Sequence, residues 1–157
     1  MPAPGEISGR SVSVVVFSGG RGSSVLSQDL VNRPDVHLTL AINGYDDGMS
    51  TGEVRRFLGD SLGPSDFRKN ASRLAKQLRT ADAAVIDLLD VRLPQGCSSG
   101  QAGAVLRERT SAPEFAPIAD RLQWFVRELE SEGRPFDFND CSIGNLVFAG
   151  CYLKARR

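Results

Sequence analysis

The sequence contains few of the side chains that most often carry out catalysis or bind metal ions. Its 157 residues include one histidine, and its three cysteines form no close pair of the kind that binds zinc. The single histidine, His37, falls on the face of an expected strand that is opposite the core face, so a Ser-His-Asp or Cys-His mechanism has little support. The odd number of cysteines argues against a complete disulfide framework. We expect Cys97, Cys141 and Cys151 to be packed thiols.

The sequence also lacks net charge and long apolar runs. Nineteen basic residues balance nineteen acidic ones, which gives no reason to expect nonspecific binding to nucleic acid or membrane surfaces. No segment approaches the roughly 20 apolar residues that span a bilayer, and residues 1–10 lack the core of a signal peptide. We therefore expect a cytoplasmic protein with neither a nucleic-acid nor a membrane partner, in which any anion site is local.

A glycine-rich loop between a strand and a helix is the strongest local pattern. A valine-rich strand over 11–17 is followed by Gly19, Gly20 and Gly22, and a helix is expected from Ser23 or Ser24 that ends before the Asn32-Arg33-Pro34 segment. The dense valines predict a strand that is buried on both faces. Such a loop at a helix N-terminus favours phosphate, with a simple tight turn as the alternative. Neither the NAD fingerprint nor the Walker pattern is complete.

The remaining pattern predicts an α/β protein that is rich in helix after residue 50. A second strand is expected over 36–43, and it leads into the ligand-binding edge of a parallel sheet. Helices are expected over 53–58, 64–78, 101–109, 116–132 and 142–155. The stretch 81–91 is too densely apolar for periodicity to separate a helix from a third strand, and we favour a helix. Two strands are few for a covered parallel sheet, so the chain is expected to be an incomplete domain over 11–157, preceded by a loose leader over 1–10.

Two acidic motifs follow the second strand. Asp46 and Asp47 are adjacent in a loop bounded by glycines, where Mg²⁺ between protein and phosphates would offset their repulsion. The alternative is a pair of solvated turn residues. Asp66 begins a helix, where a carboxylate is also expected as a cap. Arg68 could reach phosphate, although a solvated arginine is the more frequent case.

Four ordered motifs resemble one family. They are Phe17-Ser18-Gly19-Gly20-Arg21-Gly22, Ile42 to Gly52 with its central Asp46-Asp47-Gly48, Pro64-Ser65-Asp66-Phe67-Arg68-Lys69-Asn70, and Ser142-Ile143-Gly144-Asn145-Leu146. The chain resembles the family that joins CofD-type phospholactate transferases to YvcK-type gluconeogenesis factors, which implies a Rossmann-like nucleotide-binding fold. The resemblance implies a nucleotide-linked ligand of the GDP or UDP type. It assigns phosphate and ligand contacts to Gly19, Gly20, Arg21, Gly22, Ser23, Asn43, Ser50, Arg68 and Asn145. It also assigns a Mg²⁺ site to Asp46, Asp47 and Asp66, with Asp47 and Asp66 as the catalytic pair.

The family offers two functions. Its transferase branch moves a phospholactyl-type group from a guanosine diphosphate-linked donor to a hydroxyl acceptor with Mg²⁺. Its other branch is similar to sugar-nucleotide-binding regulators of carbon use and cell-wall synthesis. Arg21 replaces the usual threonine of the first motif, and the Asp66 motif is closer to the regulator branch. The resemblance thus predicts a transferase, with a non-enzymatic regulator as the alternative and a homodimer left open.

Overall fold

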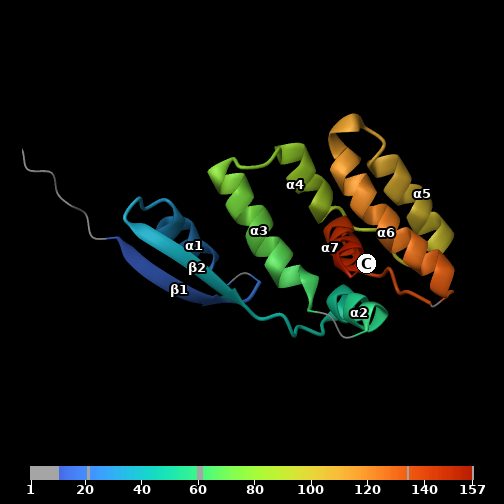
Figure 1. Ribbon diagram of the computed structural model, residues 1–157, viewed down its shortest axis with the longest axis horizontal. Helices are drawn as coiled ribbons and strands as arrows, with labels where there is room; N and C mark the ends of the chain where they lie inside the picture. Colours follow the sequence, from blue (N-terminus) through green and yellow to red (C-terminus); the bar gives the residue numbers. More distant parts are fainter. Residues whose placement is uncertain (1–10, 21, 60–61, 134, 157) are drawn as a thin grey trace, which may run out of the picture. The chain divides into compact units, whose positions relative to one another are not determined.

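The structure, a computed structural model, describes residues 11–20, 22–59, 62–133 and 135–156. The chain forms two units, Met1–Asn43 and Gly44–Arg157, and each is described by itself (Figure 1). The leader expected over 1–10 and the substituted Arg21 lie outside the described residues.

The N-terminal unit is a β-α-β arrangement. It consists of β1 (Val12–Ser18), α1 (Ser24–Val31) and β2 (Val36–Ile42). The strands pair in parallel, from Val12 opposite Val36 to Ser18 opposite Ile42, and α1 packs against β2. The predicted α/β class and parallel pairing are therefore confirmed. The strand-helix-strand order also follows the sequence pattern, and both strands lie within one residue of their expected ranges.

Burial in this unit differs from the expectation of a strand covered on both faces. Val16 is 8% exposed, whereas Val15 and Phe17, which alternate with it, are 56% and 86% exposed. The prediction of two covered faces is thus wrong for β1. A single helix can cover only one face of a two-stranded sheet, and successive side chains of a strand point to opposite faces.

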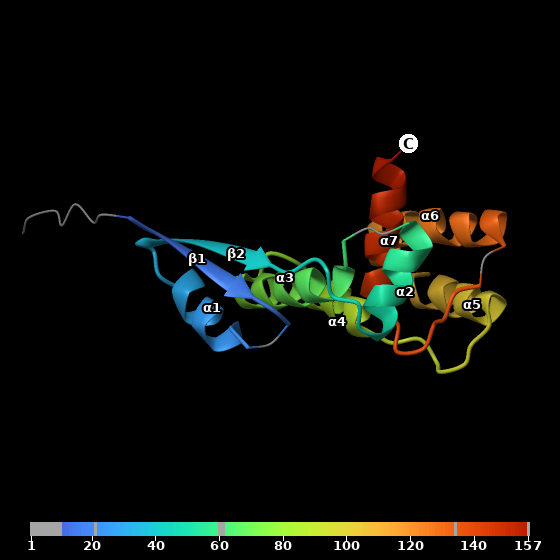
Figure 2. The same cartoon turned by 90° about the horizontal axis from the view of Figure 1, so that it is seen from below.

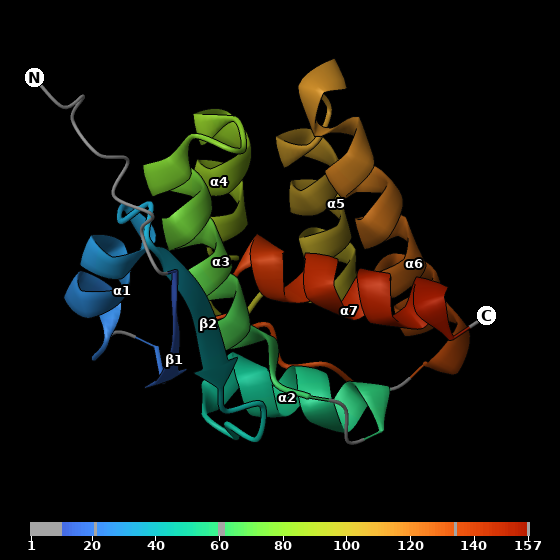
Figure 3. The same ribbon diagram turned by 60° about the vertical axis from the view of Figure 1, so that its left-hand side comes forward.

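The C-terminal unit is helical. Its elements are α2 (Met49–Leu58), α3 (Pro64–Leu78), α4 (Ala83–Asp90), α5 (Ser99–Arg109), the short 3-10 helix Pro113–Phe115, α6 (Ala116–Glu132) and α7 (Ile143–Ala155). Helix α7 contacts α2, α3, α4 and α6, and it runs steeply across α5 and α6 (Figures 2 and 3). At the α6–α7 crossing, a Cβ on Gly150 would overlap the carbonyl oxygen of Arg121. Only glycine permits this close approach.

The core of the C-terminal unit is closed around aromatic side chains. Phe125 is fully buried, and its ring lies 5.3 Å from that of Phe57 and 5.2 Å from that of Phe136. Cys141 is also fully buried, whereas Cys151 is exposed. The expectation that all three cysteines are packed thiols is therefore wrong for Cys151, which lies near the end of α7.

The structure resolves the ambiguous stretch 81–91, and it adds detail to the predictions for α2 and α3. The 81–91 stretch is helical as α4, where the Asp82 side chain caps the first turn by accepting from the Ala84 N–H. Helix α2 begins at Met49 rather than Glu53. In α3 the apolar residues Phe67 and Leu78 are 55% and 46% exposed, while Arg68 on another face is 9% exposed. Among the described residues, no helix combines the length and apolarity needed to span a membrane.

Candidate functional site

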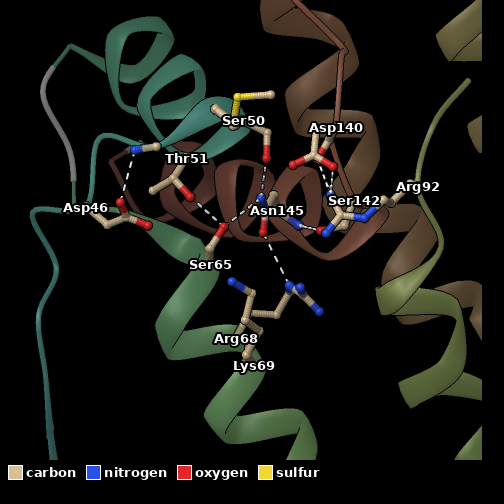
Figure 4. Close-up of a pocket in the computed structure, with 12 residues that line it drawn as sticks. Asp46, Ser50, Thr51, Ser65, Arg68, Lys69, Arg92, Asp140, Ser142 and Asn145 are labelled. Carbon is tan, nitrogen blue, oxygen red and sulfur yellow. Dashed lines mark hydrogen bonds and ion pairs between the residues drawn. The ribbon is translucent and has the colours of Figure 1, made fainter. Parts of the chain in front are cut away.

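Three helix N-termini meet around one cavity in the C-terminal unit. The cavity measures about 170 Å³ and is lined by the first turns of α2, α3 and α7 together with the segments that precede α5 and α7 (Figure 4). Its lining residues are Asp46, Gly48, Met49, Ser50, Thr51, Ser65, Arg68, Lys69, Arg92, Asp140, Ser142 and Asn145. The N-terminus of a helix presents unpaired N–H groups and a partial positive charge. Three such ends at one cavity therefore favour an anion.

Asn145 joins the three helix starts. Its side chain is 2% exposed, and its Nδ2 donates to the hydroxyl of Ser50 in α2 at 2.9 Å and to the hydroxyl of Ser65 in α3 at 3.0 Å. Its own backbone N–H donates to the side chain of Ser142, which caps α7. The Thr51 hydroxyl also donates to Ser65. These buried bonds hold the first turns of α2, α3 and α7 in a defined geometry.

Arg68 extends this network toward α4. Its Nε donates to Oδ1 of Asn145 at 3.2 Å, and its guanidinium forms an ion pair with Asp90 at the end of α4. The guanidinium also lies against Gly144, where an added Cβ would lie 2.7 Å from the carbonyl oxygen of Leu89 and closer still to the Arg68 side chain. The glycine of the Gly144-Asn145 motif thus makes room for a buried arginine, while the asparagine binds it.

Two further cations line the cavity. Arg92 donates to both the backbone and the side chain of Asp140, because the segment at Val91 to Leu93 runs beside Cys141 to Ile143. Lys69, on the second turn of α3, lies 3.6 Å from the carboxylate of Asp66 and is 35% exposed. Its long contact and partial exposure leave Lys69 the most available of the three cations for a ligand.

The first turns of α2 and α3 lack side-chain caps. Glycines occupy both N-cap positions, Gly48 before α2 and Gly63 before α3, so no capping side chain competes for the first N–H groups. Met49, the first residue of α2, has a φ of 40°, which is uncommon for a residue other than glycine. Asp140, also on the cavity wall, has a φ of 56°. Two of the three positive-φ side chains among the described residues therefore lie at this cavity.

The three predicted magnesium ligands lie in different environments. Asp46 lines the cavity, and its Oδ1 accepts the Gly48 N–H at 3.0 Å. Asp47 instead pairs with Arg55 of α2 at 2.6 Å, where the arginine is 8% and the aspartate 74% exposed. Asp66 pairs with Lys69 and is not a lining residue. Of the predicted set, only Asp46 therefore lies on the cavity wall.

This donor set limits how a magnesium ion fits. Within residues 11–20, 22–59, 62–133 and 135–156, no group of three or more histidine, cysteine or acidic side chains is placed to hold a metal. Magnesium is commonly bound by one or two carboxylates together with ligand phosphates and water. Asp46 has one carboxylate oxygen left for such an ion. The residues thus fit Mg²⁺ only as an ion shared with a phosphate ligand.

The structure brings together some of the predicted ligand contacts. Ser50, Arg68 and Asn145 meet at the cavity, although Arg68 is buried in an ion pair rather than solvated. The other described contacts, namely Gly19, Gly20, Gly22, Ser23 and Asn43, belong to the N-terminal unit. There the Ser23 hydroxyl bonds the hydroxyl of Ser18 at 2.5 Å instead of capping α1. Arg21 lies outside the described residues.

Sequence reasoning missed six polar residues of the cavity. Four of them lie inside the quoted motifs, so their spacing next to Ser50, Asp66 and Asn145 was a usable signal; they are Thr51, Ser65, Lys69 and Ser142. Arg92 and Asp140 are 48 positions apart and belong to no motif. Only the pairing of their two segments brings them to the cavity, and a single sequence carries no signal for that pairing.

The chain is similar to proteins named gluconeogenesis factor. Over 79 residues it is 37% identical to the protein from Listeria monocytogenes and 35% identical to the one from Listeria innocua. The matched segment is half of this chain and 23% of the length of each relative. No family model and no solved structure matches the chain. Gluconeogenesis factors form one branch of the family that the sequence motifs resemble.

Proposed function

We propose that the chain is part of a nucleotide-binding regulator similar to the gluconeogenesis factors, and that its cavity binds a phosphate group of the ligand. The observation that carries this proposal is the meeting of the first turns of α2, α3 and α7 at one cavity. Backbone N–H groups at a helix N-terminus bind phosphate without a dedicated cation. Lys69 and the Asn145 network add positive charge and hydrogen-bond donors at the same wall.

The dimensions of the cavity indicate which part of a nucleotide it would take. Pockets that enclose whole small molecules measure about 300–1,000 Å³. The cavity of about 170 Å³ is smaller. It is lined mainly by hydroxyl, amide and charged groups, and none of the described lining residues is an aromatic one that could stack on a base. A phosphate or diphosphate group matches this lining, while the base and sugar would extend beyond it.

A phospholactyl-type transferase is the second candidate. It is supported by the four ordered motifs, and in it Asp46 would hold Mg²⁺ against the phosphates of a GDP-linked donor, where the ion would neutralise developing charge. The names of the similar proteins and the displacement of Asp47 and Asp66 from the cavity favour the regulator. We therefore place the regulator first.

The proposal is tested by measuring nucleotide affinity in two lysine variants of α3. Lys69→Gln removes the lysine at the cavity, and Lys76→Gln removes an exposed lysine of the same helix that has a similar ion pair, 3.5 Å from Asp87. By isothermal titration with pyrophosphate, GDP and UDP-N-acetylglucosamine, we expect Lys69→Gln to weaken binding about tenfold, as one charge-assisted hydrogen bond would. Lys76→Gln should leave affinity unchanged. Equal affinity in both variants would contradict the proposal.

Magnesium separates the two candidates in the same titrations. A regulator whose helix N-termini supply the positive charge should bind a uridine nucleotide equally well with Mg²⁺ or with a chelator. A transferase should bind GDP only when Mg²⁺ is present, and Asp46→Asn should abolish this Mg²⁺-dependent binding. Mg²⁺-dependent binding of GDP that is lost in Asp46→Asn would contradict the regulator and support the transferase.

A further inference from the structure

An apolar groove runs along the seam between α5 and α6, in the helical unit but separate from the phosphate cavity. Two adjoining cavities of about 160 Å³ each follow this seam, and they share Gly103, Leu106 and Val126 as lining residues. One cavity continues to Leu122 and the other to Phe138. The two helices lie side by side in two views of the molecule (Figures 1 and 3).

The groove exists because α5 presents small residues along the seam. An added Cβ on Gly100 would have no heavy atom within 4 Å, and one on Gly103 would meet only the guanidinium of Arg107, at 3.4 Å or more. Leu106 is the one bulky apolar side chain that α5 contributes among the described lining residues, whereas α6 contributes four: Leu122, Phe125, Val126 and Leu129. The open space lies above the α5 backbone, and its floor is the edge of the hydrophobic core.

Two arginines flank one end of this groove. Arg107 of α5 and Arg127 of α6 both line the cavity and are exposed. No ion pair joins either of them to an acidic side chain within the described part of the chain, although Arg127 lies over the ring of Trp124 at 5.9 Å. At the other end, the lining charge is negative, at Glu130. The groove is thus apolar along its floor and charged with opposite signs at its ends.

We propose that this groove binds an acidic amphipathic helix of a partner protein. A furrow between two neighbouring helices has the shape that a third helix fills, with apolar anchors at i, i+3 or i+4, and i+7. Eleven residues of α5 are about 16 Å long, which corresponds to three turns of the partner. Carboxylates of the partner face Arg107 and Arg127, and its opposite end carries a basic residue near Glu130.

The proposal is tested with two synthetic helical peptides labelled for fluorescence anisotropy. Both carry leucines at i, i+3 and i+7 in an alanine background, and the flanking positions are glutamates in one peptide and lysines in the other. The complete 157-residue chain should bind the glutamate peptide at least tenfold more tightly than the lysine peptide. Equal binding of both peptides, or binding of neither at millimolar concentration, would overturn the proposal.

Charge reversal in the protein provides the reciprocal test. Arg107→Glu combined with Arg127→Glu should invert the preference, so that the lysine peptide binds more tightly. Arg109→Glu makes the same charge change on the same helix outside the groove lining, and it should alter affinity less than twofold. An effect of Arg109→Glu as large as that of the double variant would mean that only overall charge matters, which would overturn the groove as the binding site.

Filling the groove tests its location without removing a buried contact. Gly103→Leu places a side chain where only the flexible Arg107 end lies within 4 Å, and it replaces a helical glycine by a better helix former. It should lower affinity for the glutamate peptide at least tenfold while the thermal midpoint stays the same or rises. Unchanged affinity would overturn the proposal. So would a chain that dimerises through this seam in sedimentation, with Gly103→Leu abolishing the dimer, since the occupant would then be a second copy.

Discussion

The two units of the chain differ in how far they bury their apolar side chains. In the N-terminal unit Val15 and Phe17 of β1 are more than half exposed, and in the C-terminal unit Phe125 and Leu146 are fully buried. The helical unit surrounds α7 with four other helices, whereas one helix covers one face of a two-stranded sheet. Burial of the apolar side chains thus depends more on the number of covering elements than on how apolar a segment is, because β1 has a larger share of apolar residues than α7 but is the more exposed of the two.

Buried serines of the two units differ in their hydrogen bonds. In the C-terminal unit Ser50, Ser65 and Asn145 are buried and hydrogen-bonded to one another. In the N-terminal unit the hydroxyl of Ser27 is buried without a hydrogen-bond partner among the described residues. Buried polar groups that are hydrogen-bonded hold their side chains in one geometry. A buried polar group without a hydrogen bond lowers the stability of the folded state by about 1–3 kcal/mol. The cavity at the starts of α2, α3 and α7 is therefore bordered by polar groups whose arrangement is defined by their own hydrogen bonds.

Matched phenylalanine substitutions should give the largest contrast between the units. Phe125→Ala removes a fully buried ring that contacts two other rings, so we expect a loss of about 3–5 kcal/mol in the free energy of unfolding. Phe17→Ala removes a ring that is 86% exposed and should change it by less than about 0.5 kcal/mol. Urea unfolding measures both. Comparable losses would show that the face of β1 bearing Phe17 is covered in solution.

Substitution of the asparagine hub should have the next largest effect. Asn145→Ala leaves the Ser50 and Ser65 hydroxyls and the Arg68 guanidinium with fewer partners, so we expect a loss of about 1–3 kcal/mol. Asn139→Ala is the control, because this exposed side chain makes one bond, to the Gly96 N–H. Urea unfolding should find a much smaller loss for the control. If the two variants lose equal stability, the network does not hold the helix starts together.

The closed core should also appear in the pH dependence of stability. Burial raises the pKa of the Cys141 thiol from 9.0 to about 12. Between these values the unfolded chain releases this proton and the folded chain retains it, so the free energy of unfolding should fall by about 1.4 kcal/mol per pH unit. Below pH 9 the contribution is fully present. Urea unfolding of the native chain and of Cys141→Ala at several pH values isolates this slope. A constant difference between them would show that the thiol reaches solvent.

A matched pair of serines should show the smallest effect, with opposite signs in the two units. Ser27→Ala removes a buried hydroxyl without a partner from a helix and should stabilise the chain by about 0.5 kcal/mol. Ser65→Ala removes a hydroxyl that accepts from Thr51 and Asn145, and it should destabilise by about 1 kcal/mol. Thermal midpoints suffice for the comparison. A destabilising Ser27→Ala would mean that this hydroxyl has a partner in solution.

Sequence reasoning succeeded where the determining signal is local. Helix α6 follows its apolar periodicity and α7 its apolar composition, and Gly133 and Ser142 mark an end and a start as expected. It failed for the faces of β1, because exposure depends on which other elements are present. Phe67 and Leu78 form an apolar stripe of α3, yet its buried face carries Arg68 and Asn70. Arg68 donates to Asn145 and Asn70 donates to the carbonyl oxygen of Asp66, and no apolar pattern within α3 indicates that these groups are buried.

For the candidate site, the family resemblance that the motifs carry implied that Ser50, Arg68 and Asn145 contact one ligand. The amino-acid sequence by itself determined the helices, the β-α-β order and the positions of the helix starts, because caps, glycines and periodicity act within a few residues. Only the tertiary structure decided that α2, α3 and α7 begin at one cavity and that Asp47 pairs with Arg55 rather than lining it. Those outcomes depend on contacts between segments far apart in the chain, whose geometry is set by packing around α7.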